Sequence, residues 1–352
     1  MQSKITVALV AFLLICNTLL AQAEDKLVQH LQDISVTVKA PGLYGESQGS
    51  GVIITREVKS SKDGNDTEIV NFVWTAAHVV DNLRSVRSII ENGQPKKVIE
   101  FKDAQIVQEL VENGRKVGEI KMDARVIRYS DSEDGQDLAL LMIRKRNFVT
   151  ASAQFYLEDD QIIPIGTELF HVGSLLGQVG SNSMTRGIMS KVGRVLDLGS
   201  SGGAVFDQTT VTAFPGSSGG GVYLSDQNGD NSGKYIGMLV RGAGEGFNFI
   251  VPVRRMNEWA NKVKVPWALD DSVAIPSVEE LLEEPIEDAS FVKDGKTIKS
   301  DAEENNKKHG LHFMIRITPN PPQTEIGKFW DRGQDAAINR AIIESAERSI
   351  QR

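Results

Sequence analysis

The sequence predicts an all-β fold built from one or two antiparallel β-barrels. Between residues 34 and 253 of the 352-residue chain, short runs of β-branched and other apolar residues alternate with turn residues. Asn113–Gly114 stands between two such runs, and this dipeptide favours a tight β-hairpin. No long segment with helical periodicity interrupts the region. Many short strands joined by hairpins are typical of barrels and not of a parallel α/β sheet.

Each predicted strand is a short run with a high content of Val, Ile, Leu or aromatic residues, bounded by Gly, Pro, Asn, Asp or Ser. In chain order they are Asp33–Ala40, Gly49–Val58, Ile69–Ala76, Lys96–Phe101, Gly118–Tyr129, Leu138–Arg144, Glu168–Gly173, Gly221–Leu224, Tyr235–Gly242 and Phe247–Val253. A short helical turn is expected at Val79–Arg84. A helix over Arg254–Lys264 is expected to close the β region.

The first 23 residues have the pattern of a secretory signal peptide. Lys4 precedes the apolar run Ile5–Leu20, and Ala21–Ala23 has the small-residue pattern of a cleavage site. A membrane anchor is the weaker alternative because the run is short, and lipidation of Cys16 is disfavoured by the bulky residues before it. The sequence therefore predicts a periplasmic or secreted protein that begins near Glu24. No later apolar run is long enough for a stable membrane span.

Composition excludes several classes of site. The formal net charge of -8 gives no general attraction to nucleic acid. The only cysteine, Cys16, lies in the signal peptide, so the rest of the chain has no disulfide, thiolate nucleophile or cysteine-bound zinc. Between Asp270 and Glu304, 12 acidic residues stand against 3 lysines. Residues 265–352 are therefore predicted to be an acidic linker and a C-terminal extension of mixed or helical structure, with unknown role.

Three short motifs carry residues suited to acyl transfer. A serine hydroxyl needs a histidine to accept its proton, and the histidine needs a carboxylate to fix its tautomer. His78 follows an apolar strand that ends in small residues, and Asp137 precedes a buried strand. The pentapeptide GSSGG occurs twice, at Gly199–Gly203 and at Gly216–Gly220.

Taken in the order His, Asp, Ser, the motifs TAAHVV, DLALL and PGSSGG resemble the trypsin/chymotrypsin-like serine peptidases. The segments GSGVII, SMTRGIMSKVGR and GFNFIVPV resemble the exported HtrA/Deg branch of that class. The resemblance covers roughly residues 34–264. It implies a chymotrypsin-like double barrel of two six-stranded antiparallel barrels, at about 24–150 and 151–264, which together form a peptidase domain over residues 24–264.

The resemblance also assigns roles to residues. His78 would be the general base, Asp137 its orienting carboxylate and Ser218 the nucleophile, because Ser218 follows the Pro-Gly pair that leads the nucleophile loop of the family. Ser201 lies where relatives carry a variable loop, and it is expected to be flexible Gly/Ser loop. The backbone N–H groups of Gly216 and Ser218 would form the oxyanion hole.

The resemblance extends to substrate contacts. Thr212, six residues before the nucleophile, would line the base of the primary specificity pocket. Because Thr212 is uncharged, we expect a small or medium apolar residue before the scissile bond instead of Lys or Arg. Leu239, Val240 and Arg241 resemble the edge that pairs with an extended substrate.

The sequence therefore predicts a serine endopeptidase that cleaves exported or misfolded proteins through an acyl-enzyme and needs no metal or cofactor. An alternative is a catalytically silent scaffold that binds a protein partner, and a third is an enzyme that awaits activation. No PDZ-like carboxylate-binding loop follows Lys264, unlike in most HtrA relatives. The sequence is compatible with a homo-oligomer but does not fix one.

Overall fold

The computed structural model describes residues 26–287 apart from 43–44, 61–65, 92–93, 113, 133–134, 159–161, 198–202, 243 and 245, together with residues 314–315. The predicted signal peptide, Ser201 and most of the predicted C-terminal extension lie outside the described residues. Among the described residues, no helix is long and apolar enough to cross a membrane.

The first barrel consists of six antiparallel strands in the order β1-β2-β3-β8-β7-β6, and pairing of β6 with β1 closes it. Its strands are β1 (Ser35–Gly42), β2 (Gly45–Lys59), β3 (Thr67–Thr75), β6 (Ala104–Glu112), β7 (Arg115–Ser130) and β8 (Leu138–Ile143). Every side chain of β8 is buried. This burial explains why β8 is an uninterrupted apolar run without the alternation of a half-exposed strand.

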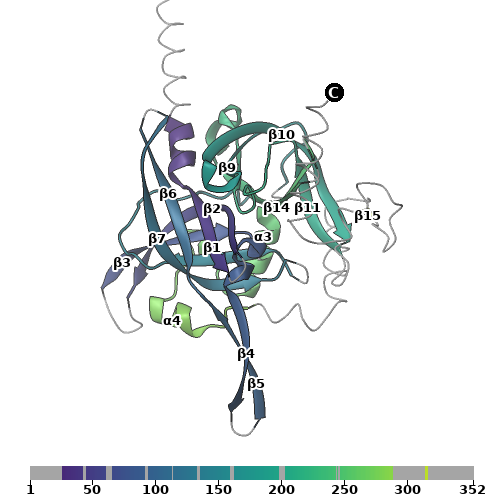
Figure 1. The fold of residues 1–352 in the computed structure, drawn as a ribbon. Coiled ribbons are helices and arrows are strands. Elements are labelled where there is room, and N and C mark those ends of the chain that lie inside the picture. The colour runs from purple at the N-terminus through teal and green to yellow at the C-terminus, as the bar shows by residue number, and fades with distance from the viewer. Residues whose placement is uncertain are drawn as a thin grey trace, which may run out of the picture.

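A separate two-stranded hairpin projects from the first barrel (Figure 1). It consists of β4 (Arg84–Glu91) and β5 (Gln94–Phe101), which pair along their whole length. The sequence analysis predicted a strand at Lys96–Phe101, which lies within β5, and it did not predict β4. The hairpin belongs to neither barrel, so it does not position the candidate catalytic residues.

The second barrel also contains six antiparallel strands. They are β9 (Glu168–Leu175), β10 (Gly180–Asp197), β11 (Gly203–Thr209), β12 (Gly221–Leu224), β13 (Tyr235–Gly242) and β14 (Asn248–Pro252). Each strand pairs with two neighbours in the ring β9-β10-β11-β14-β13-β12, so the ladder returns to β9. A short strand, β15 (Met314–Ile315), adds a parallel pairing to β10. The predicted all-β class with two six-stranded antiparallel barrels is confirmed.

Few helices accompany the strands. Residues 26–33 form a helix before β1 that the sequence analysis did not predict. α2 (Ala77–Val80) and a 3-10 turn (Asp81–Leu83) follow β3, close to the predicted helical turn. α3 (Val253–Lys262) corresponds to the helix predicted at the end of the β region. Further 3-10 turns occur at Gly177–Val179, Asp226–Asn231 and Pro266–Ala268.

Residues 265–287 pack against the first barrel. Trp267 is 1% exposed, and its ring centroid lies 4.8 Å from that of Phe72 on β3. The indole N–H of Trp74 donates to the carbonyl oxygen of Ala268 at 3.1 Å. The last helix of this segment, α4 (Val278–Glu283), begins with a capping box, in which the side chain of Ser277 accepts from the backbone of Glu280. The predicted domain boundary at residue 264 stays a prediction, but the packed core continues past it.

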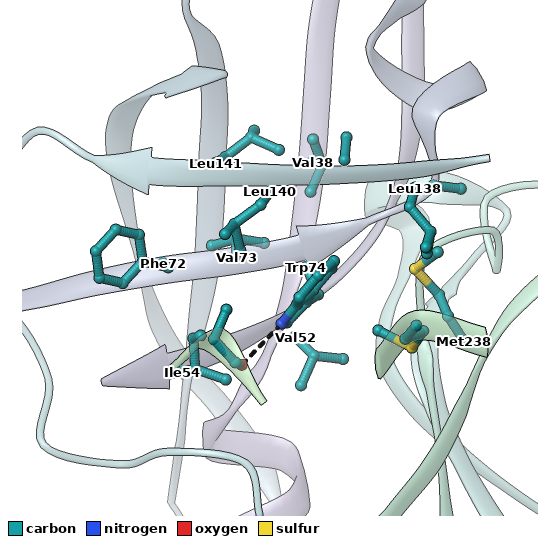
Figure 2. Packing of buried hydrophobic residues seen from close by; sticks show 14 of the residues in the cluster. Val38, Val52, Ile54, Phe72, Val73, Trp74, Leu138, Leu140, Leu141 and Met238 are labelled. Atoms are coloured by element: carbon teal, nitrogen blue, oxygen red, sulfur yellow. Dashed lines mark hydrogen bonds between the residues drawn. The ribbon is translucent and has the colours of Figure 1, made fainter. Parts of the chain in front are cut away.

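The two barrels share one continuous apolar core. Figure 2 shows Met238 of β13 in the same packed cluster as Trp74 of β3 and Leu138 of β8. A second, smaller cluster fills the second barrel, and it includes Leu169, Val222, Leu224, Ile236 and Ile250. Since burying apolar surface is the main favourable contribution to folding, the shared cluster fixes the barrels against each other. The loops that meet at this junction are the ones that carry the candidate catalytic residues.

Candidate active site

His78 stands on the short helix α2, directly after β3. The two residues before it, Ala76 and Ala77, are fully buried, whereas the side chain of His78 remains 14% exposed. Small residues at these two positions let the helix lie against the barrel wall. The imidazole therefore lies at the junction of the two barrels, largely buried and next to an interior carboxylate.

Asp137 lies beside the imidazole. Both of its carboxylate oxygens are 3.0 Å from Nδ1 of His78, and Oδ1 also accepts the backbone N–H of His78 at 3.1 Å. The carboxylate is 2% exposed. A carboxylate in this position favours the tautomer with the proton on Nδ1, which leaves Nε2 with a lone pair to accept a proton.

The backbone of Asp137 adopts an uncommon conformation. Its φ of 57° is in the left-handed region, which Asp tolerates better than most residues but which still costs about 1 kcal/mol. The preceding loop holds it there, because the N–H of Asp137 donates to the carbonyl oxygen of Asp131 at 3.1 Å. The neighbouring N–H of Gln136 donates to Oγ of Ser130 at 2.9 Å.

Ser218 lies in the loop between β11 and β12, flanked by glycines that the conformation requires. Gly216 and Gly219 have φ values of +93° and +89°. A Cβ on Gly216 would come within 2.4 Å of the carbonyl oxygen of Ser174, and one on Gly219 within 2.1 Å of the carbonyl oxygen of Ser50. Both the dihedral and the packing therefore demand glycine.

Ser50 of β2 joins this loop to the first barrel. Its N–H donates to the carbonyl oxygen of Ser218 at 2.7 Å, and its hydroxyl donates to the carbonyl oxygen of Gly216 at 2.7 Å. Thr75, at the end of β3, donates its hydroxyl to the carbonyl oxygen of Ser50 at 2.7 Å. Because Thr75 precedes His78 by three residues, these contacts bring the Ser218 loop to the end of β3 from which His78 projects. Sequence reasoning assigned Ser50 no role, although it lies in the quoted motif GSGVII.

The loop also shapes a candidate oxyanion hole. The N–H of Ser217 is occupied, since it donates to the carbonyl oxygen of Phe214 at 2.9 Å. The side chain of Ser217 closes the same turn by accepting the N–H of Phe214 at 3.1 Å. In the part of the chain that the structure describes, the N–H groups of Gly216 and Ser218 donate to no protein acceptor. These are the two donors that the sequence analysis assigned to the oxyanion hole.

The sequence model of the trypsin-like peptidase domain family matches residues 49–233, more than half of the chain. The chain belongs to this family. A curated relative, the "Serine protease Do-like HtrA" of Lactobacillus helveticus, is 30% identical over 225 residues, which are 62% of this chain and 44% of the relative. This chain thus spans less than half the length of that relative. The predicted resemblance to trypsin-like serine peptidases of the HtrA type is confirmed.

Two solved structures are similar to the chain. The serine endoprotease from Yersinia pestis is 20% identical with a TM-score of 0.44, and the match covers 74% of this chain and 66% of that one. An HtrA-type protease solved with a tripeptide is 19% identical with a TM-score of 0.45, and the match covers 69% of this chain and 62% of that one.

The residues predicted to contact substrate lie near the Ser218 loop. The carbonyl oxygen of Thr212 accepts a hydrogen bond from the hydroxyl of Thr185 at 3.0 Å. The carbonyl oxygen of Leu239 accepts the N–H of Gly219 at 2.7 Å, and its N–H donates to the carbonyl oxygen of Gly220 at 3.0 Å. The hydroxyl of Ser218 lies 3.4 Å from the carbonyl oxygen of Val240. Arg241 donates from Nη2 to the carbonyl oxygen of Ser132 at 3.1 Å, in the loop that leads to Asp137.

Two further titratable groups lie close to this site. His171 of β9 is fully buried next to the Ser218 loop, with Nδ1 2.9 Å from the carbonyl oxygen of Gly221. Burial lowers the pKa of His171 to about 4, so it is a neutral core residue at ordinary pH. The carboxyl of Asp81 accepts the hydroxyl of Tyr129. Desolvation raises the pKa of Asp81 to about 6.

Proposed function

We propose that this protein is a serine endopeptidase that hydrolyses peptide bonds through an acyl-enzyme on Ser218. The observation that carries the proposal is the hydrogen-bonded pair of His78 and Asp137, with the glycine-flanked Ser218 loop held against the same strand end by Ser50. Membership of the trypsin-like peptidase domain family and the HtrA-type relative support the same enzyme class.

In the proposed mechanism, His78 moves the protons. Oγ of Ser218 attacks the carbonyl carbon of the scissile peptide while Nε2 of His78 takes the hydroxyl proton. Asp137 stabilises the imidazolium through Nδ1. The C–N bond then breaks as His78 returns the proton to the leaving amine. A water molecule repeats the sequence on the ester, which releases the acid and restores Ser218.

The charge that develops on the carbonyl oxygen is stabilised by the N–H groups of Gly216 and Ser218. Preorganised donors of this kind are usually the largest single contribution to acyl-transfer catalysis. Gly216 is fixed by its carbonyl contact with Ser50 and by the packing of its Cα against the backbone of Ser174 and Gly177. The donors would therefore not have to reorganise when the oxyanion forms.

The proposed substrates are exported or misfolded polypeptides, cleaved after a small or medium apolar residue. Thr212 supports the apolar preference because it provides no buried charge at the expected base of the specificity pocket. The signal-peptide pattern of residues 1–23 supports a periplasmic or secreted location.

Labelling with a fluorophosphonate probe tests the proposal. The probe phosphonylates an activated serine, so the folded wild-type protein and Ser201→Ala should both be labelled, and Ser218→Ala and His78→Ala should not. Ser201→Ala is the matched control because it alters the other copy of GSSGG. Absence of labelling in the folded wild-type protein, even with unfolded casein added, would contradict the proposal and favour a binding scaffold or a form that awaits activation.

A further inference from the structure

Arg255 is a buried cation that reaches the loop of the catalytic carboxylate from the other barrel. It lies on α3, after the last strand of the second barrel, and is 6% exposed. Its guanidinium donates from Nε to the side-chain oxygen of Gln136 and from Nη2 to the backbone oxygen of Gln136 at 3.2 Å. Gln136 directly precedes Asp137. The hydrogen bonds from Arg255 therefore fix the residue whose backbone orients the carboxylate of Asp137.

The other side of the guanidinium is anchored in the second barrel. Nη1 donates to the carbonyl oxygen of Val205 on β11 at 3.1 Å, and the guanidinium carbon lies 4.6 Å from the centre of the Phe206 ring. A planar guanidinium with its fork and its face both engaged has little freedom to move. Arg255 therefore links Gln136 to β11 through hydrogen bonds and holds the two at a fixed distance.

A second arginine holds the same loop. Nη2 of Arg241 donates to the carbonyl oxygen of Ser132 at 3.1 Å. Two guanidinium groups thus bind this loop: Arg241 contacts it near its start, and Arg255 contacts it directly before Asp137. Without these two arginines, only contacts within the first barrel would hold the left-handed backbone of Asp137.

Arg254, the neighbour of Arg255 in α3, makes a structural ion pair and serves as a comparison. Arg254 forms a two-bond ion pair with the buried carboxylate of Asp207, at 2.7 and 2.5 Å. The hydrogen bonds of Arg255, within the described part of the chain, go to uncharged oxygens instead. A buried cation without a carboxylate in contact is costly, and an apolar side chain would fill the same space more favourably. Burial lowers the pKa of Arg255 to about 9, and the charges of Asp137 and Glu258, which raise the pKa, offset this effect only in part.

We propose that Arg255 is the positioning residue of the catalytic carboxylate: through Gln136 it fixes Asp137 so that both carboxylate oxygens face Nδ1 of His78. This inference rests on the proposed function. It also states that the alignment of the His78–Asp137 pair depends on the second barrel, although both residues belong to the first.

Matched lysine variants of the two neighbouring arginines test the proposal. Arg255→Lys and Arg254→Lys both keep the charge and both lose a guanidinium fork in the same helix. We expect Arg255→Lys to lower kcat by about 100-fold on a peptide p-nitroanilide with valine before the scissile bond, since small misplacements of catalytic groups have effects of this size. KM should change little. Arg254→Lys should keep the wild-type kcat.

A spectroscopic readout separates positioning from simple loss of fold. The proton shared by Nδ1 of His78 and Asp137 should give a low-field proton resonance in the wild-type protein and in Arg254→Lys, and this resonance should be lost or shifted in Arg255→Lys. Equal kcat values and equal resonances in the two lysine variants would overturn the inference. If Arg255→Lys does not fold, Gln136→Ala takes its place: loss of kcat and of the resonance supports the inference, and wild-type values overturn it.

The same measurements keep the two proposals distinguishable. A wild-type protein that no fluorophosphonate labels would contradict the proposed function. The resonance would still decide the role of Arg255, because it reports the geometry of His78 and Asp137 without any turnover. A labelled wild-type protein with unchanged Arg255→Lys would contradict the role of Arg255 alone.

Discussion

The hydroxyl of Ser50 donates a hydrogen bond to the carbonyl oxygen of Gly216 at 2.7 Å, and it accepts the N–H of Ser174 at the same distance. One side chain of the first barrel thus links the Ser218 loop to β9 of the second barrel. The bond orients the peptide on the C-terminal side of Gly216, next to the proposed oxyanion donors. Its removal should therefore affect both stability and chemistry.

We predict that Ser50→Ala destabilises the fold by about 1–3 kcal/mol, because the buried N–H of Ser174 loses its acceptor. The rate of fluorophosphonate labelling should fall by about 10- to 100-fold. Ser35→Ala is the control. Ser35 is 2% exposed, and among the described residues its hydroxyl has no partner, so its removal should leave both quantities at or above wild type. Similar losses in the two variants, measured by denaturant unfolding and labelling rate, would argue against a special role for Ser50.

Gly219→Ala should strongly reduce the rate of fluorophosphonate labelling through a steric clash and not through backbone strain alone. Gly219 has a φ of +89°, and an added Cβ would lie 2.1 Å from the carbonyl oxygen of Ser50. Gly166 has nearly the same φ, +91°, with no atom within 4 Å of an added Cβ. Gly166→Ala therefore measures the dihedral penalty alone, about 1 kcal/mol.

In this pair of variants, Gly166→Ala should keep the wild-type labelling rate, and Gly219→Ala should reduce it by more than about 100-fold. Thermal unfolding should show the larger destabilisation in Gly219→Ala. If the two variants unfold at the same temperature and are labelled equally, the packing of the loop against Ser50 is not tight.

Ten of the strands and the two motifs that contain His78 and Ser218 were predictable because they depend on local sequence, whereas β4, β6, β10 and β11 were not predicted. Apolar runs identified β3, β8 and β13. The roles proposed for His78, Asp137 and Ser218 came from the family resemblance of the motifs that contain them. The supports of the site were not predictable in this way. Ser50 acts across the junction between barrels, and a serine in a strand carries no local signal for that contact.

Arg255 was missed for a different physical reason. A charged residue in the amphipathic pattern of α3 is expected to face solvent, because arginine is rarely buried. Its partner, Gln136, is far away in the sequence, so no spacing rule connects them. The packing of Trp267 was missed because the acidic and proline-containing composition around it favours an extended linker. Tertiary contacts outweighed composition at that position.

The carboxyl of Asp81 should make stability depend on pH. The pKa of Asp81 is raised from 3.8 to about 6, mainly by desolvation; the hydrogen bond from Tyr129 and the charge of His78 lower it, and Asp137 and Asp131 raise it. Between these values the folded protein binds more protons than the unfolded chain. The contribution of Asp81 to stability is therefore full below its ordinary pKa and is lost as the pH rises through about 6.

Asp81→Asn removes this titration, so the variant should gain stability relative to wild type as the pH rises from about 4.5 to 7.5. Tyr129→Phe removes a donor that favours the ionised carboxyl, so the loss of stability should move to a higher pH. Denaturant unfolding across this pH range measures both effects. Parallel stability profiles for the wild type and both variants would show that Asp81 does not titrate in this window.

The segment that follows α3 should be required for a stable peptidase fold. Trp267 is 1% exposed and packs on Phe72, and residues 286 and 287 continue the contact through a hydrogen bond from the N–H of Tyr129 to the carbonyl oxygen of Ile286 at 2.8 Å. The guanidinium of Arg84, at the base of the projecting hairpin, pairs with the carboxylate of Glu287. Residues 265–287 therefore pack on the outside of the first barrel, against β3 and β7.

We predict that Trp267→Ala destabilises the protein by about 3–5 kcal/mol, the usual result of deleting a buried aromatic side chain. A chain that ends at residue 264 should be destabilised further, since it loses this contact and the hydrogen bond from Trp74 to Ala268 together. A chain that ends at residue 287 is the matched control, because both truncated chains lack β15 and differ from each other only by residues 265–287. If the chain that ends at 264 has the same unfolding free energy and labelling rate as the one that ends at 287, the peptidase domain ends at 264 and the packed segment is only an appendage.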